Sequence, residues 1–365
     1  MLNKLPLTLY RYIGRTFAGY VALMLGMLLG VVLLFDTLEL FRRASKKAEL
    51  DIFAVLQMSL LKLPEVGQQI IPLAILFGAM YAFWKLTRSQ ELIVARSAGV
   101  SAWQFLLPAL VIGLGFGIVK ITVINPFSSV LITKFVEQEN RYFRGQTSGI
   151  NLAASGLWLR QANPQGETII HAENIKPETM EISDAVALFF EGDQFMGRLD
   201  APYGRLVNGE WQFGHAWINE PGRAPVEVEG YRINTDLTAN TIEESFAQPD
   251  QISFWALPDY IRTLEETGFS AIRTRLHYYG LLAEPLLFAG MVLIAAAFSL
   301  RPPRRGGTLM LVAAGLMTGF GFFFLRDLAQ ALGTSETIPP TIAASIPAIC
   351  SILTGLAALL QSEDG

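Results

Sequence analysis

The stretch FAGYVALMLGMLLGVVLLF, residues Phe17–Phe35, contains no charged side chain. A transmembrane helix needs roughly 20 mostly apolar residues, so this run is long enough to cross a bilayer. It is followed at once by DTLELFRRASKKAELD, in which four basic residues lie close together: Arg42, Arg43, Lys46 and Lys47. The basic stretch before Phe17 precedes no small-residue cleavage pattern, so we interpret residues 17–36 as an uncleaved first span.

The composition of the whole chain agrees with a membrane protein. Of its 365 residues, 52% are hydrophobic and 16% are charged, which also leaves room for a sizeable soluble part. Six apolar runs meet or approach the length of a span: 17–36, 64–84, 103–124, 278–300, 307–328 and 337–361. Several contain proline, which neighbouring helices accommodate in a membrane bundle.

The segment between the third and fourth spans has a different character. Short alternating runs such as GLWLRQ and APVEVEGYRI are separated by the turn signals NPQG, EGD, VNGE and NEPG. We therefore predict an α-helical membrane protein with six transmembrane helices and an inserted all-β, jelly-roll-like or sandwich domain. The expected domains are residues 1–125, 126–275 and 276–365, and helical spacing in 249–268 predicts an interfacial or domain-packing helix.

Lysine and arginine in the short loops indicate the orientation. Basic residues precede the first span, lie between the second and third spans, and recur between the fourth and fifth spans, so these segments and both termini are expected to be cytoplasmic. The β domain and the RRASKK stretch then face outward. Two interpretations of RRASKK stay open: nearby acids, Asp36, Glu39, Glu49 and Asp51, neutralise a solvated helix end, or the cations meet an anionic ligand.

Further ionisable residues fall at the outer ends of the spans. They are Lys62, Glu65, Lys120, Glu284, Arg326 and Asp327. Charges in or near spans are costly and often mark a substrate path. Together with Arg42 and Arg43 they predict a belt that suits an amphiphile with an anionic headgroup. The alternative is snorkelling and ion pairing within the bundle, for example of Arg326 with Glu284.

A short helix is expected in the cytoplasmic segment 87–101. Thr87 and Gln90 have the spacing of a capping box, and Gly99 is suited to end the helix. Its acid, Glu91, is expected to be exposed, and the helix either lies on the membrane surface or enters a groove on a partner. No G-x-x-x-x-G-K-[ST] phosphate loop occurs, so a motor that hydrolyses nucleotide would be another chain.

Other functional classes find little support. The net charge of −4 with scattered basic residues argues against nucleic acid as a partner. A single cysteine permits neither a disulfide framework nor a cysteine-based metal site. The three histidines are far apart and no H-E-x-x-H or G-x-S-x-G motif occurs, so we predict a non-catalytic chain without a cofactor.

Five strings in a fixed order carry a family resemblance: RYIGRTF, FDTLELFRRA, LKLPE, RSQELIVARSAGVS and SGLWLRQ. Together with the order of three spans, a β domain and three spans, the chain resembles the lipopolysaccharide export permeases LptF and LptG along nearly its whole length. The likeness is closer to the LptG members than to the LptF members.

The resemblance implies the permease subunit of an ABC exporter in the inner membrane of a Gram-negative bacterium. Its expected partners are an LptB-like ATPase dimer, which would bind ATP and Mg, an LptF-like second permease and an LptC-like jelly-roll protein. Lipopolysaccharide would be lifted from the outer leaflet and passed to a bridge of periplasmic jelly rolls.

The resemblance also implies roles for particular residues. The ATPase-coupling set is Glu91, Leu92, Ala95, Arg96 and Gly99. Arg42 and Arg43 match the family's basic pair that contacts lipid phosphates. Charge and expected depth add the other members of the predicted lipid-binding set, Lys46, Lys47, Lys62, Lys120 and Arg326. A membrane-anchored periplasmic scaffold or sensor without transport is the alternative of another class, and an enzyme acting on lipid headgroups is a third.

Overall fold

A computed structural model represents the whole chain and divides it into two compact units. One contains residues 1–135, 253–255 and 275–365, and the other contains 136–252 and 256–274. The described residues are 7–45, 52–97, 99–139, 141–142, 149–153, 156–163, 166–176, 179–192, 194–207, 209–235, 248–266, 270–300 and 307–363.

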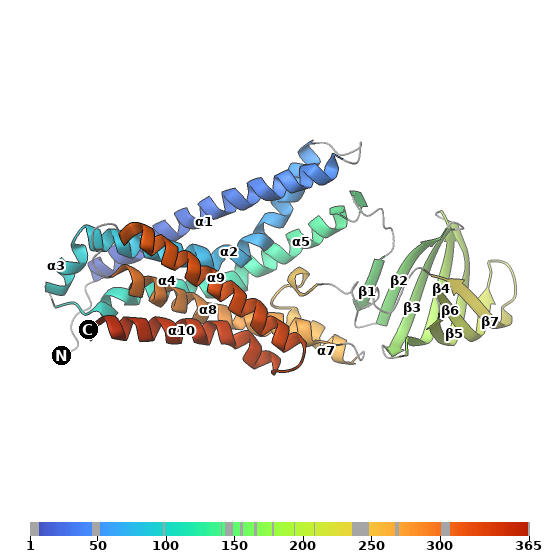
Figure 1. Cartoon of the computed structure of the whole chain (residues 1–365). Helices are drawn as coiled ribbons and strands as arrows, with labels where there is room; N and C mark the ends of the chain where they lie inside the picture. Colours follow the sequence, from blue (N-terminus) through green and yellow to red (C-terminus); the bar gives the residue numbers. More distant parts are fainter. Residues whose placement is uncertain are drawn as a thin grey trace. The chain divides into compact units, whose positions relative to one another are not determined.

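The first unit is helical (Figure 1). Its elements are α1 (Leu7–Ala44), α2 (Ile52–Arg88), α3 (Glu91–Ser97), α4 (Ala102–Val119), the π-helix η1 (Lys120–Ile124), α5 (Asn125–Glu139), α8 (Ile272–Ser299), α9 (Gly307–Thr334) and α10 (Pro340–Glu363). Among the described residues, six helices of this unit are long and apolar enough to cross a membrane, with α4, η1 and α5 joined into one. The predicted spans are thus confirmed, and the helices extend beyond most of them because their polar ends continue the backbone hydrogen bonds.

Glycine permits the closest helix contacts in this unit. A Cβ on Gly78 of α2 would lie 2.6 Å from the Val21 Cα of α1, so these two helices cross with their backbones nearly touching. A Cβ on Gly117 of α4 would lie 2.5 Å from the Pro285 Cα of α8. Small residues are the usual means of close helix approach in membranes, where van der Waals packing drives association.

In its described residues, the second unit contains an antiparallel sheet of seven strands. They are β1 (Gly149–Ala153), β2 (Gly156–Asn163), β3 (Gly166–Lys176), β4 (Glu181–Glu191), β5 (Gln194–Val207), β6 (Glu210–Asn219) and β7 (Val226–Asn234). Their order in the sheet is their order in the chain. The predicted turn signals fall between strands: Asn163 pairs with Gly166 around NPQG, and Val207 pairs with Glu210 around VNGE.

The predicted all-β insert is confirmed, and its core lies on one face of the curved sheet (Figure 1). Alternate residues such as Ile170, Leu199 and Trp211 are fully buried there, as the period of two in a strand requires. The amide of Gln161 on β2 donates to the Asn234 carbonyl of β7 at 3.1 Å. Because β2 and β7 are distant in the strand order, this bond shows that the sheet curls toward closure.

After β7 along the chain, the described residues include the 3-10 helix η3 (Pro249–Gln251) and α7 (Leu257–Glu266). Leu264, Tyr260 and Ile261 pack against the apolar core of the sheet. The domain-packing interpretation of this helix is therefore confirmed. The predicted helical spacing began too early, because Phe254 lies before α7 in a connector that belongs to the helical unit.

Candidate functional site

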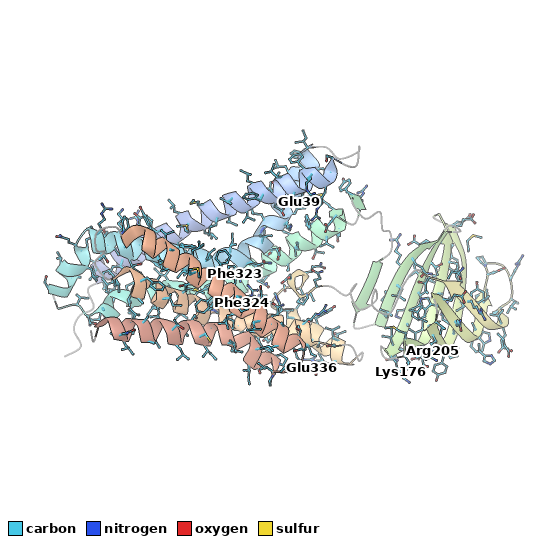
Figure 2. The ribbon with its side chains drawn as sticks, viewed as in Figure 1. Glu39, Lys176, Arg205, Phe323, Phe324 and Glu336 are labelled. Carbon is cyan, nitrogen blue, oxygen red and sulfur yellow. The ribbon has the colours of Figure 1, made fainter. Side chains whose placement is uncertain are left out.

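Arg42 and Arg43 lie in the last turn of α1 and share one carboxylate. Arg42 donates to Glu39 through Nε and Nη2, both at 2.8 Å, and Arg43 donates through Nε at 3.0 Å. The Arg42 side chain is still 71% exposed. Arg42 uses two of its five N–H donors on Glu39, so three donors of this exposed guanidinium are not engaged by that carboxylate. Glu39 is labelled at this end of α1 in Figure 2.

Of the other acids expected to neutralise this stretch, Asp36 is engaged elsewhere. Its Oδ1 accepts a hydrogen bond from Lys62 Nζ of α2 at 2.6 Å, and that ammonium also lies 5.7 Å from the Phe135 ring centroid. Lys62 is thus a partly buried clamp between helices as well as a candidate lipid contact. The predicted residues Lys46, Lys47, Glu49 and Asp51 lie outside the described residues, as does the side chain of Arg96.

Lys120 is placed differently from the expected outer belt. It lies at the start of η1, its side chain is 3% exposed, and it forms an ion pair with Glu284 of α8, whose side chain is 12% exposed. A buried ammonium that already has its carboxylate is not presented to a lipid phosphate in this conformation. The suggested pairing of Glu284 with Arg326 is wrong, because Glu284 pairs with Lys120.

Arg326 of α9 instead borders a small apolar pocket that is partly open to the outside. Its other lining residues come from four helices: Gln69, Pro72, Leu73, Leu76, Leu287, Met291, Gly319, Phe322, Phe323 and Pro347. Among the described residues Arg326 has neither a hydrogen-bond partner nor an ion-pair partner, and it is exposed. An unpaired guanidinium beside an apolar pocket can hold the phosphate of an amphiphile whose chain enters the pocket.

The predicted coupling segment forms the seven-residue helix α3, which lies at the same end of the helical unit as the start of α1 and the end of α10 (Figure 1). Leu92 and Ala95 are buried in the apolar core with Leu86 and Phe105, so they anchor α3 to the unit. Val94 projects outward and is exposed. The helix therefore has one face fixed and one face available to a partner.

Gly99 ends this helix as predicted. Its φ is 85°, and the Val100 N–H donates to the Ala95 carbonyl at 3.1 Å, the pattern of a glycine-terminated Schellman motif. The predicted capping box is wrong. Thr87 lies inside α2, where its hydroxyl donates a hydrogen bond to the Phe83 carbonyl. A capping box instead joins Ser101 with Gln104 at the start of α4.

Two further residues hold Glu91, and sequence reasoning missed both. The Ser89 hydroxyl donates to Glu91 Oε1 at 2.8 Å, and the side chain of Tyr12 on α1 is hydrogen-bonded to the same carboxylate. Glu91 is consequently half-buried and oriented, where an exposed acid was expected. Ser89 is close enough in sequence to be considered, whereas no local pattern indicates Tyr12.

Helices long and apolar enough to span a membrane, together with an inserted β unit, define the class of multi-pass membrane proteins with an extramembrane domain. Residues 11–361 match the lipopolysaccharide export system permease LptF/LptG family, and the chain belongs to that family.

Its similarity to individual relatives is also spread over the whole length. The chain is 24% identical to the lipopolysaccharide export system permease protein LptG of Escherichia coli K12, over 97% of this chain and 98% of that protein. It is 24% identical to the LptG protein of Haemophilus influenzae, over 95% of this chain and 96% of that protein.

Proposed function

We propose that this chain is the LptG-type permease subunit of an ABC exporter that extracts lipopolysaccharide from the outer leaflet of the inner membrane. The observation that carries the proposal is the exposed guanidinium of Arg326 beside an apolar pocket, where it pairs with none of the described residues. Arg42 and Arg43 supply a second cationic site at the end of α1. A phosphorylated glycolipid has both the anionic groups and the acyl chains that such an arrangement binds.

In this proposal the β unit is periplasmic, both termini are cytoplasmic and the chain itself is non-catalytic. An LptB-like ATPase dimer binds ATP and Mg and docks on α3. An LptF-like permease pairs with this chain, and the two together enclose a cavity for the lipid. Closure of the cavity expels the lipid toward an LptC-like jelly-roll protein. The apolar interior of the β unit receives acyl chains, each CH₂ contributing roughly 0.8 kcal/mol on burial, and its edge strands pair with the next jelly roll.

Lipid retention tests the binding half of this proposal. The full-length protein is extracted with its associated chains, and bound lipopolysaccharide is quantified by mass spectrometry. Arg326→Gln and the double variant Arg42→Ala, Arg43→Ala should each retain less lipid, by roughly tenfold if about 1.4 kcal/mol of binding is lost. Arg326→Lys keeps the charge, and Lys134→Ala removes an exposed cation of α5 outside the set, so both should retain more lipid than Arg326→Gln. Unchanged lipid retention in both Arg326→Gln and the Arg42→Ala, Arg43→Ala double variant would contradict the proposal.

The coupling half is tested on α3. Glu91→Ala should reduce the amount of ATPase that copurifies with the chain, since the carboxylate is held ready for a partner by Ser89 and Tyr12. Glu91→Gln preserves the shape and distinguishes loss of charge from loss of packing. A chain that copurifies with no ATPase and holds only ordinary phospholipid, under conditions in which complexes survive extraction, would favour the anchored scaffold or sensor.

A further inference from the structure

The end of the helical unit that carries α3 has an excess of positive charge. Within residues 7–20 and 81–99 the basic residues are Arg11, Arg15, Lys85, Arg88 and Arg96, and the acidic residue is Glu91. Glu91 is already held by Ser89 and Tyr12. In the part of the chain that the structure describes, neither Lys85 nor Arg88 at the end of α2 forms an ion pair with a carboxylate.

Lys85 and Arg88 are instead positioned by aromatic rings. Lys85 Nζ donates to the Tyr20 hydroxyl at 2.5 Å and lies 5.2 Å from the centroid of that ring. Arg88 lies 5.2 Å above the Trp84 ring. Tyr81 connects the two, since its ring centroid is 4.8 Å from that of Tyr20 and 5.6 Å from that of Trp84.

This arrangement orients the cations without neutralising them. A ring attracts a cation through its quadrupole but contributes no negative charge, and the Lys85 ammonium keeps two of its three donors for another acceptor. Both Lys85 and Arg88 are exposed. Together with Tyr20 they form a cationic platform, which we define as Tyr20, Tyr81, Trp84, Lys85 and Arg88.

An uncovered apolar surface begins at this platform and follows α1. Leu23 and Met27 lie three and seven residues after Tyr20, on the same helix face, and are 62% and 64% exposed. Gly26 and Gly30 add no side chain, and a Cβ on either would meet nothing within 4 Å. The surface is therefore shaped for a chain that lies along the helix.

We propose that the cationic platform binds the phosphate headgroup of an anionic phospholipid, with Lys85 and Arg88 contacting the phosphate and an acyl chain lying along Leu23 and Met27. Tyrosine and tryptophan at the membrane boundary are suited to the headgroup level, and basic pockets between helices on the cytoplasmic side recognise anionic headgroups. An acidic protein would satisfy the cations but not the apolar surface inside the span. The proposal does not depend on lipopolysaccharide export.

Native mass spectrometry tests this with two lipids that share acyl chains. The full-length protein, extracted with its associated chains and freed of native lipid, is titrated with dioleoyl phosphatidylglycerol and with dioleoyl phosphatidylcholine. We expect phosphatidylglycerol to bind about tenfold more tightly, a preference that the double variant Lys85→Gln, Arg88→Gln abolishes. Lys134→Gln, a matched change on α5, should keep it. Equal affinity for the two lipids in the wild-type protein would overturn the proposal.

Two further measurements keep the result interpretable if the double variant folds poorly. The charge-preserving pair Lys85→Arg, Arg88→Lys should retain the preference, and its loss there would count against the proposal. Tyr20→Phe removes the hydroxyl that accepts from Lys85, and should weaken phosphatidylglycerol binding severalfold with little change for phosphatidylcholine. If the double Gln variant releases a copurified protein and keeps its phosphatidylglycerol preference, the cations serve a protein contact and the lipid site is refuted.

Discussion

Lys120 and Glu284 join α8 to the π-helix through a buried ion pair. Removing one member leaves the other charged in an apolar setting, which typically costs about 3–5 kcal/mol. We expect Glu284→Leu to lower the thermal unfolding midpoint of the full-length protein in detergent. The double variant Lys120→Met, Glu284→Leu should recover much of that loss, because no unpaired charge remains. A double variant that is less stable than Glu284→Leu would show that the pair is not the origin of the effect.

Gly78 and Gly26 differ in how much space surrounds them, so alanine should have opposite effects at the two positions. Alanine at Gly78 would place its Cβ 2.6 Å from the Val21 Cα, so α1 and α2 must separate, and overpacking of this kind costs about 1–3 kcal/mol. Alanine at Gly26 meets nothing within 4 Å and gains helix propensity, about 1 kcal/mol in a helix interior. Differential scanning fluorimetry should therefore rank Gly26→Ala at or above the wild type and Gly78→Ala below it. The reverse order would contradict the close crossing of the two helices.

At the scale of elements, the junction of η1 and α5 holds the connector Ser253–Trp255, which follows the sheet in the chain. Asn125, just after η1, is buried, and its Oδ1 accepts the Phe254 N–H at 2.8 Å. The Phe254 ring stacks on Tyr278 of α8 with centroids 5.5 Å apart. Such π segments often occur at functional sites because they interrupt the regular ladder of backbone bonds. The residues Ser253–Trp255 are thereby fixed to the helical unit.

Asn125→Ala should release this connector. The Phe254 N–H would lose its acceptor, at a cost of about 1–3 kcal/mol, and hydrogen exchange in the peptide around Phe254 should accelerate. Trp255→Phe serves as the comparison, because the Trp255 Nε1 to Thr122 carbonyl distance is a long 3.4 Å and the ring is exposed. In Trp255→Phe, the peptide around Phe254 should exchange hydrogen at nearly the wild-type rate. Equal protection in Asn125→Ala and the wild type would exclude the proposed attachment.

The sequence predicts these elements well where local physics decides them. An apolar run of about 20 residues has the length and composition of a transmembrane helix. NPQG and VNGE separate strands because Gly, Pro and Asn adopt the backbone conformations of tight turns. It predicts the partners of charged residues poorly, because Lys120 and Glu284 are 164 residues apart and meet only after folding. Nothing in the composition of KITVI distinguishes a π-helix from an α-helix. The capping box failed at Thr87 because α2 continues through that residue.

At the scale of the whole molecule, the two units have separate apolar cores. The helical core is built from residues such as Phe17, Phe83 and Phe288, and the core of the sheet from residues such as Leu199 and Trp211. None of the residues described in either core belongs to the other unit. A unit that buries its own apolar side chains has the main requirement for folding alone.

Residues 136–274, produced without the helices of the first unit, should therefore fold cooperatively. Because Leu199 is fully buried in this core, Leu199→Ala should lower its free energy of unfolding by about 2–5 kcal/mol. Tyr203→Ala on the same strand, β5, should change it little, since Tyr203 is 72% exposed. Thermal unfolding followed by far-UV circular dichroism measures both variants. Absence of a cooperative transition in the isolated unit, or equal effects of the two substitutions, would mean that the core of the sheet depends on the helical unit.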